Sequence, residues 1–171
     1  MTVRRERAEV SLVALDEPSR RLLAAFDDHP AQKVASVFME REIGGAWRLI
    51  IRLPSPTGDK RRTVSLWLDQ SGVPSLEFGA WHTHTDLWDD DINLGLEKML
   101  LYLERITDGS VQLSAQPATA AGVPYCIVDL ENPDDVLDEL TYPGAPNEVN
   151  LLSWSGAEDR TLDINSVGRP G

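Results

Sequence analysis

Two of the three histidines in this chain lie two residues apart, in the segment Phe78-Gly79-Ala80-Trp81-His82-Thr83-His84-Thr85-Asp86. Alternate side chains of a β-strand point to the same face, so His82 and His84 are predicted neighbours, joined by Asp86 if the strand continues. Two imidazoles and a carboxylate could ligate Zn²⁺ or another divalent metal, whose bound water could hydrolyse a substrate. One hypothesis is therefore a divalent-metal-dependent hydrolase with these three ligands. Glu77 is its candidate base, although alternation places Glu77 on the opposite face of the strand.

A structural role is the interpretation we favour for the same histidines. The strand expected over 75–84 puts them on one face with Leu76 and Phe78, and puts Trp81 on the other. Buried polar groups usually find hydrogen-bond partners inside the protein without an ion. We therefore expect the histidines at the edge of the core, with no cofactor.

Acidic residues gather at two expected helix starts, and we predict that they bind a protein partner. Carboxylates near a helix N-terminus also favour the helix dipole, so solubility and capping are the alternative roles. Trp88 lies beside the first group and is the expected aromatic anchor, because tryptophan is over-represented among binding hot spots. The predicted partner-binding residues are Asp86, Trp88, Asp89, Asp90, Asp91, Asp134, Asp135, Asp138 and Glu139.

The charge of the chain indicates what kind of partner to expect. The net charge is −12 over 171 residues. Residues 1–84 contain 12 basic and 11 acidic side chains, whereas residues 85–171 contain 4 basic and 17 acidic ones. Nucleic acid repels such a chain unless a basic patch is present, and the two basic clusters, at 4–7 and 60–62, have no interleaved aromatic residues. A basic protein is therefore the expected partner, and nucleic acid is not.

Several other chemistries are excluded by composition. Cys126 is the only cysteine, so the chain has no internal disulfide and no multi-cysteine zinc site. The longest apolar runs have five residues, which predicts neither a membrane span nor a secretory signal, and we expect a cytoplasmic protein without membrane partners.

The elements that must position these residues follow from the periodicity of the apolar side chains. The alternation of Leu49 and Ile51 with Arg48 and Arg52 is typical of a strand with one buried face. Expected strands cover 33–40, 46–53, 63–69, 75–84, 111–115, 125–130 and 149–154, with 160–164 as a further candidate. Expected helices begin at Asp16-Glu17-Pro18, at Ile92 and at Asn132-Pro133.

This order of elements predicts an α+β fold. We expect one mainly antiparallel sheet of about six or seven strands, with about three helices packed largely on one face. No linker or repeat divides the chain, so we expect a single domain over 1–171 with a frayed tail at about 166–171.

Two short motifs resemble a known group of proteins. They are Phe-Gly-Ala-Trp-His-Thr-His-Thr-Asp at 78–86, followed by an acidic turn and an amphipathic helix, and Leu-Ser-Trp-Ser-Gly-Ala-Glu-Asp at 152–159. Together they resemble small uncharacterised bacterial α+β proteins, some of which resemble immunity proteins of bacterial toxin systems. The resemblance implies a binding role without catalysis.

These observations lead to one expectation and one alternative. The expectation is an acidic protein-interaction module, not an enzyme, that binds a basic protein, with an immunity-type inhibitor as one form of it. The alternative is the metal-dependent hydrolase centred on His82 and His84. The identity of the partner or substrate, the oligomeric state and the spatial neighbours of Cys126 stay open.

Overall fold

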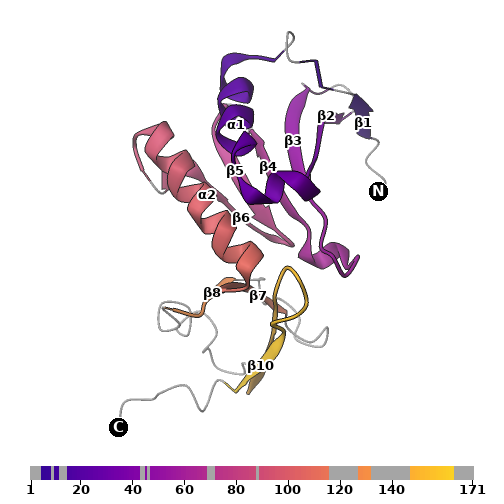
Figure 1. Cartoon of the computed structure of the whole chain (residues 1–171), viewed down its shortest axis with the longest axis vertical. Helices are drawn as coiled ribbons and strands as arrows, with labels where there is room; N and C mark the ends of the chain where they lie inside the picture. Colours follow the sequence, from indigo (N-terminus) through magenta and orange to yellow (C-terminus); the bar gives the residue numbers. More distant parts are fainter. Residues whose placement is uncertain are drawn as a thin grey trace.

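The computed structural model is an α+β structure with two antiparallel sheets and two α-helices in the part of the chain that it describes (Figure 1). It describes residues 5–8, 10–11, 15–42, 45, 47–68, 72–87, 89–115, 127–131 and 147–163. The predicted α+β class with antiparallel pairing is confirmed.

The first sheet is a meander of six strands that are neighbours in chain order. Every pair in it is antiparallel, and the connections from β2 to β6 are short, whereas α1 and η2 lie between β1 and β2. In register, Ile51 lies opposite Leu66, and Leu66 lies opposite Leu76, so apolar side chains collect on one face. The strands are β1 (Arg5–Ala8), β2 (Ser36–Glu42), β3 (Arg48–Leu53), β4 (Val64–Leu68), β5 (Pro74–Phe78) and β6 (Trp81–His84).

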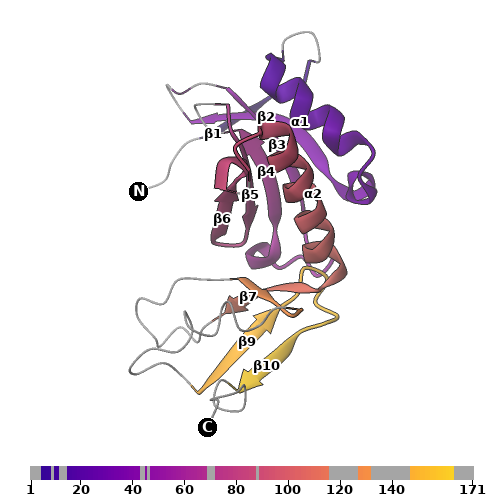
Figure 2. The same cartoon turned by 90° about the vertical axis from the view of Figure 1, so that its left-hand side faces the viewer.

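Both α-helices cover that apolar face, as expected (Figure 2). Helix α1 spans Glu17–Asp27, and the side chain of Asp16 caps it by accepting a hydrogen bond from the Ser19 amide at 2.9 Å. Helix α2 spans Ile92–Asp108 and ends at Gly109, whose φ of 91° is left-handed. Three short 3₁₀ helices, η2 (Pro30–Val34), η3 (Lys60–Arg62) and η4 (Thr85–Leu87), connect the longer elements.

The second sheet has four antiparallel strands in the order β10-β9-β7-β8. They are β7 (Val111–Ala115), β8 (Ile127–Asp129), β9 (Glu148–Leu152) and β10 (Arg160–Asp163). Leu113 and Leu152 of this sheet belong to the same core cluster as the first sheet and the helices. Val128, Val149 and Leu151 form a second, smaller cluster.

Two sequence expectations about the sheets are wrong. We expected one sheet of about six or seven strands, whereas the structure has two separate sheets. The helix α2 lies between β6 and β7, and β7 pairs with β8 and β9 instead of with the first sheet. The strand expected over 75–84 is a hairpin, with Gly79-Ala80 as the turn between β5 and β6. Three other features lie outside the described residues: the helix expected to begin at Asn132-Pro133, the single cysteine Cys126, and the tail at 166–171. The single domain stays a prediction.

The turn at Gly79 requires glycine for two reasons. Its φ is +62°, a left-handed conformation that residues with a Cβ rarely adopt. A Cβ there would also overlap the Arg61 carbonyl oxygen and would lie 2.5 Å from Cδ2 of Leu113. The close approach of η3 and β7 at this turn therefore depends on the missing side chain.

We predict that Gly79→Ala lowers the free energy of unfolding by about 2 kcal/mol or more, through backbone strain and steric overlap together. Gly58→Ala is the control, because Gly58 has a φ of +75° but a Cβ added there would have no atom within 4 Å. It should cost only about 1 kcal/mol. Urea unfolding measures both, and equal losses would contradict the close packing at Gly79.

Candidate protein-binding surface

The acidic turn before α2 is built by two of its own carboxylates. Asp91 Oδ1 accepts hydrogen bonds from the Asn93 amide at 2.8 Å and the Leu94 amide at 3.4 Å, which caps the helix. Asp89 accepts from the Asp91 amide at 3.0 Å and pairs with Lys98 Nζ at 2.7 Å. The bond to Lys98 is the main reason that the pKa of Asp89 is lowered. These two predicted binding residues are therefore engaged within the protein.

The other two acids of the turn face solvent. Asp86 and Asp90 are exposed, and so are Glu97 and Glu104 on α2. Within the described part of the chain, none of these four carboxylates has an ion pair with another side chain.

The cations of α2 are both engaged elsewhere. Lys98 pairs with Asp89, and Arg105 Nη1 donates to Asp129 Oδ2 at 2.8 Å while its Nη2 pairs with Glu131 at 2.8 Å. Segment 86–108 contains seven acidic and two basic residues, so its outward side carries an excess of negative charge.

Exposed leucines accompany these carboxylates. Leu87, Leu94 and Leu101 are 73%, 47% and 61% exposed, and they follow one another at intervals of seven residues. Seven residues are nearly two turns of α-helix, so Leu94 and Leu101 share one side of α2. We call this set the α2 surface: Asp86, Leu87, Asp90, Leu94, Glu97, Leu101 and Glu104.

The leucines of the α2 surface were not predicted from the sequence. The helical spacing of Ile92, Leu96, Met99, Leu100 and Leu103 predicts only the apolar side of this helix, of which the structure buries Leu96, Met99 and Leu103 to 3% exposure or less and leaves Ile92 and Leu100 half-buried. The signal was present in the sequence as Leu94 and Leu101, seven residues apart on the otherwise polar side of the expected helix.

The remaining predicted partner-binding residues are not described. Five of them lie outside the described residues, and their part in a binding surface stays a prediction: Trp88, Asp134, Asp135, Asp138 and Glu139.

The histidine pair lies on the sheet face opposite the helices. His82 is exposed, His84 is half-buried, and their ring centroids are 5.5 Å apart. His84 Nδ1 lies 2.6 Å from Ser75 Oγ. The imidazole of His84 packs edge-on against the indole ring of Trp67, with 6.3 Å between the ring centroids. These contacts agree with a hydrogen-bonded, structural role for His84.

The hairpin corrects two expectations about this face. Reversal of the chain at Gly79 turns Leu76 and Phe78 toward the helices, so the histidines do not share a face with them. Glu77 is directly opposite His82 in register and therefore lies on the same face as the histidines.

The structure brings together only part of the predicted metal-ligand set. His82 and His84 are adjacent, whereas Asp86 lies in η4, after the strand has ended. Among the residues that the structure describes, no three His, Cys, Asp or Glu side chains form a group that could hold a metal ion.

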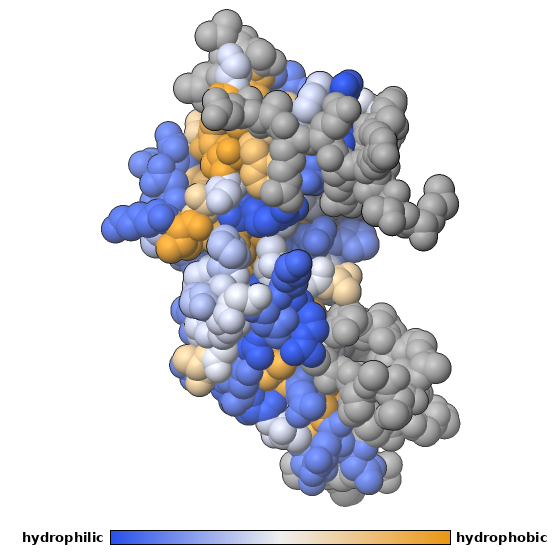
Figure 3. Space-filling view, turned by 90° about the vertical axis from the view of Figure 1, so that its right-hand side faces the viewer, coloured by the Kyte–Doolittle hydropathy of each residue, from blue (hydrophilic) through white to orange (hydrophobic). Residues whose placement is uncertain are grey.

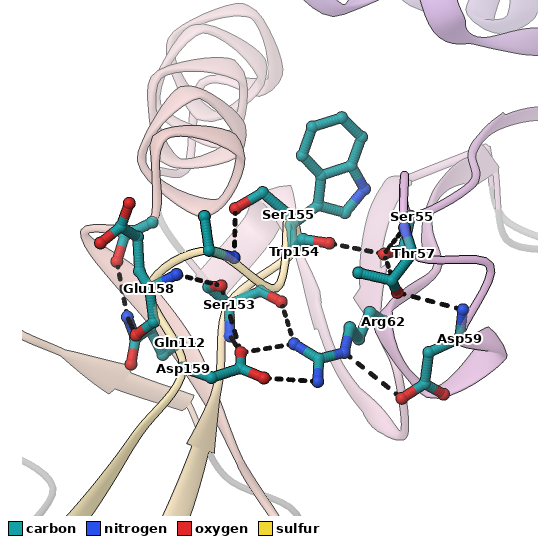
Figure 4. Close-up of polar contacts among 12 residues, drawn as sticks. Ser55, Thr57, Asp59, Arg62, Gln112, Ser153, Trp154, Ser155, Glu158 and Asp159 are labelled. Atoms are coloured by element: carbon teal, nitrogen blue, oxygen red, sulfur yellow. Dashed lines mark hydrogen bonds and ion pairs between the residues drawn. The ribbon is translucent and has the colours of Figure 1, made fainter.

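The second sequence motif, at 152–159, forms a polar junction between the two sheets (Figure 4). The largely buried Arg62 of η3 makes two hydrogen bonds to the carboxylate of Asp159, at 2.5 and 2.6 Å. It also donates to the Ser153 carbonyl oxygen at 2.8 Å and pairs with Asp59 at 3.3 Å. Nearby, Ser55 Oγ donates to the Trp154 carbonyl oxygen at 2.7 Å.

Asp159 and Arg62 stabilise each other's charged forms. The hydrogen bond to Arg62 is the main cause that lowers the pKa of Asp159, and the same contact raises the pKa of Arg62. Asp159 also accepts a hydrogen bond from the Ser153 amide at 2.9 Å, which fixes the loop of the motif. The motif therefore has a structural role that its sequence alone did not indicate.

Comparisons with protein-family models, curated proteins and solved structures find no match. Across the described parts of the chain, no helix is long and apolar enough to cross a membrane.

We predict that Asp159→Asn lowers the free energy of unfolding at neutral pH by about 1–2 kcal/mol, because hydrogen bonds to charged groups are lost. Glu17→Gln is the control, since its ion pair with Arg20 at 3.1 Å is solvent-exposed and contributes less than about 0.5 kcal/mol.

The stability difference should also depend on pH with a defined sign. The folded pKa of Asp159 lies below its ordinary value of 3.8, so its contribution is complete above that value and is lost as the pH falls through the folded pKa. Urea unfolding at decreasing pH should therefore bring the wild type and Asp159→Asn together. A difference that does not change with pH would contradict the role given to this carboxylate.

Proposed function

We propose that this protein is an acidic interaction module that binds a basic protein stoichiometrically through the α2 surface. One observation carries the proposal. The outward side of α2 has both exposed leucines and carboxylates that have no ion pair among the described residues. Apolar side chains rimmed by polar ones often mark protein-interaction sites.

The two kinds of side chain have different roles in such binding. The carboxylates attract a basic partner, raise its association rate and disfavour acidic competitors. The leucines supply affinity, because burial of a leucine side chain is worth about 1.5–3 kcal/mol. The charges of Lys98 and Arg105 are offset by Asp89 and Asp129, carboxylates that do not belong to the α2 surface.

An immunity-type inhibitor is the form of this function that the motif resemblance suggests. Many toxins of such systems are basic nucleases, which an acidic inhibitor complements in charge. The first motif leads directly into the α2 surface, whereas the second forms the Arg62 junction. A cytoplasmic location belongs to the same proposal. Trp88, Asp134, Asp135, Asp138 and Glu139 stay predicted partner-binding residues of the same function.

The proposal predicts binding that weakens with salt and with loss of particular charges. The immobilised protein is used to isolate a basic partner, which is then purified and titrated by calorimetry. Kd should increase at least about tenfold between 50 mM and 500 mM salt, because the interacting charges are screened. The double variant Asp90→Asn/Glu97→Gln should weaken binding about fivefold, by removing two exposed charges.

The matched control is Asp28→Asn/Glu148→Gln, which removes two exposed carboxylates from other elements. It changes the net charge equally, so Kd should change less than about twofold if location matters. Equal effects of the two double variants would mean that only net charge matters and would contradict the α2 surface. Affinity that does not depend on salt would contradict the function itself.

A further inference from the structure

We infer that the occupant of the α2 surface is a single basic amphipathic α-helix of the partner, lying along α2 with its apolar side on Leu94 and Leu101. This inference rests on the proposed function and adds the secondary structure and the contact residues of the partner.

The leucines face away from the protein because the opposite side of α2 is fully used. Gly95, Leu96, Met99, Leu103 and Ile106 are the buried residues of α2. With 100° per residue, Leu94 and Leu101 lie within about 20° of each other and roughly opposite the centre of this buried set. They are separated by about 10 Å along the helix axis.

This spacing fits another helix better than an extended segment. Side chains that recur about every two turns form a straight ridge along α2. This ridge can pack into the groove between the side chains of a second helix. Leu87, in η4 before the N-terminus of α2, is a further exposed leucine. A partner helix of about four turns is long enough to contact both Leu94 and Leu101 and to extend beyond each of them.

The charges beside the ridge select a basic helix over a second copy of this chain. Glu97 and Glu104 follow Leu94 and Leu101 by three residues and form one edge of the ridge. Lys98 and Arg105 follow the same leucines by four residues and form the other edge, where each is already paired with an acid of another segment. Two α2 surfaces packed antiparallel would bring these carboxylates close to one another, and the net charge of −12 on each chain opposes association in either orientation. Lysine or arginine on the flanks of a partner helix would instead pair with them.

Exposed apolar residues elsewhere provide a control. Val34 of η2 is 50% exposed and belongs to a different element from the α2 surface. The face seen in Figure 3 also shows exposed apolar side chains over the half of the molecule that contains the first sheet. Binding to apolar surface in general would therefore not be confined to α2.

The test uses a synthetic peptide of lysine and leucine, about 18 residues long, with all leucines on one side of the helix. A second peptide has the same composition but dispersed leucines, so it carries the same charge without an apolar side. Fluorescence anisotropy should show at least about tenfold tighter binding of the amphipathic peptide. Leu94→Gln/Leu101→Gln should reduce that binding at least about tenfold, while Val34→Gln changes it less than about twofold.

Each other outcome overturns a defined part of the proposal. If both peptides bind equally and the leucine variants have no effect, recognition is by charge alone, which contradicts this inference and leaves the proposed function standing. If sedimentation shows a dimer that Leu94→Gln/Leu101→Gln dissociates, the occupant is a second copy. If neither peptide nor any basic protein binds, the proposed function fails as well. Circular dichroism establishes that each variant is folded.

Discussion

The burial of one side of α2 is the constraint on which the two sheets and the α2 surface all depend. Its apolar side chains enter the core cluster formed by the first sheet and α1, and the helix then leads directly into β7 of the second sheet. The N-terminal turn is fixed by close contact, because a Cβ at Gly95 would lie 2.6 Å from the Thr85 carbonyl oxygen. This fit determines which residues of α2 face solvent.

The acidity of the C-terminal half has two separate uses. Asp91 caps α2, Asp89 holds Lys98, Asp129 holds Arg105, and Asp159 holds Arg62 at the junction. These carboxylates are satisfied within the protein and contribute to its architecture. The exposed carboxylates of the α2 surface have no ion pair among the described residues, and we propose them for recognition. Net charge alone could not separate these groups.

Much of the local structure could be predicted from the sequence. The alternation in 46–53 and 63–69 indicated β3 and β4 and one buried face of each, although Trp47, expected on that face, is 40% exposed, and Ile50 and Ser65 of the opposite face are buried as well. The period of apolar residues in α2 indicated that helix to within one residue. The hairpin at Gly79 was missed because its flanking segments, 75–78 and 81–84, each continue a strand pattern. A glycine within such a pattern is also compatible with an uninterrupted strand, so periodicity did not reveal the reversal.

The long-range contacts could not be predicted in the same way. Arg62 and Asp159 are 97 residues apart, and no local pattern indicates that they pair. The proximity of His82 and His84 was predicted because the alternation of side chains along a strand is a local property. The side of the sheet on which they lie was not, because it depends on the turn at Gly79. The exposed leucines were predictable in principle, since their interval of seven residues is visible in the sequence.

The most direct measurement of the central claim is a methyl NMR titration of the leucine-labelled protein with its purified basic partner. We expect the largest shift changes at Leu87, Leu94 and Leu101, while Leu103 on the buried side of α2 changes little. Largest changes at leucines remote from this side of α2, with Leu94 and Leu101 unaffected, would contradict the claim.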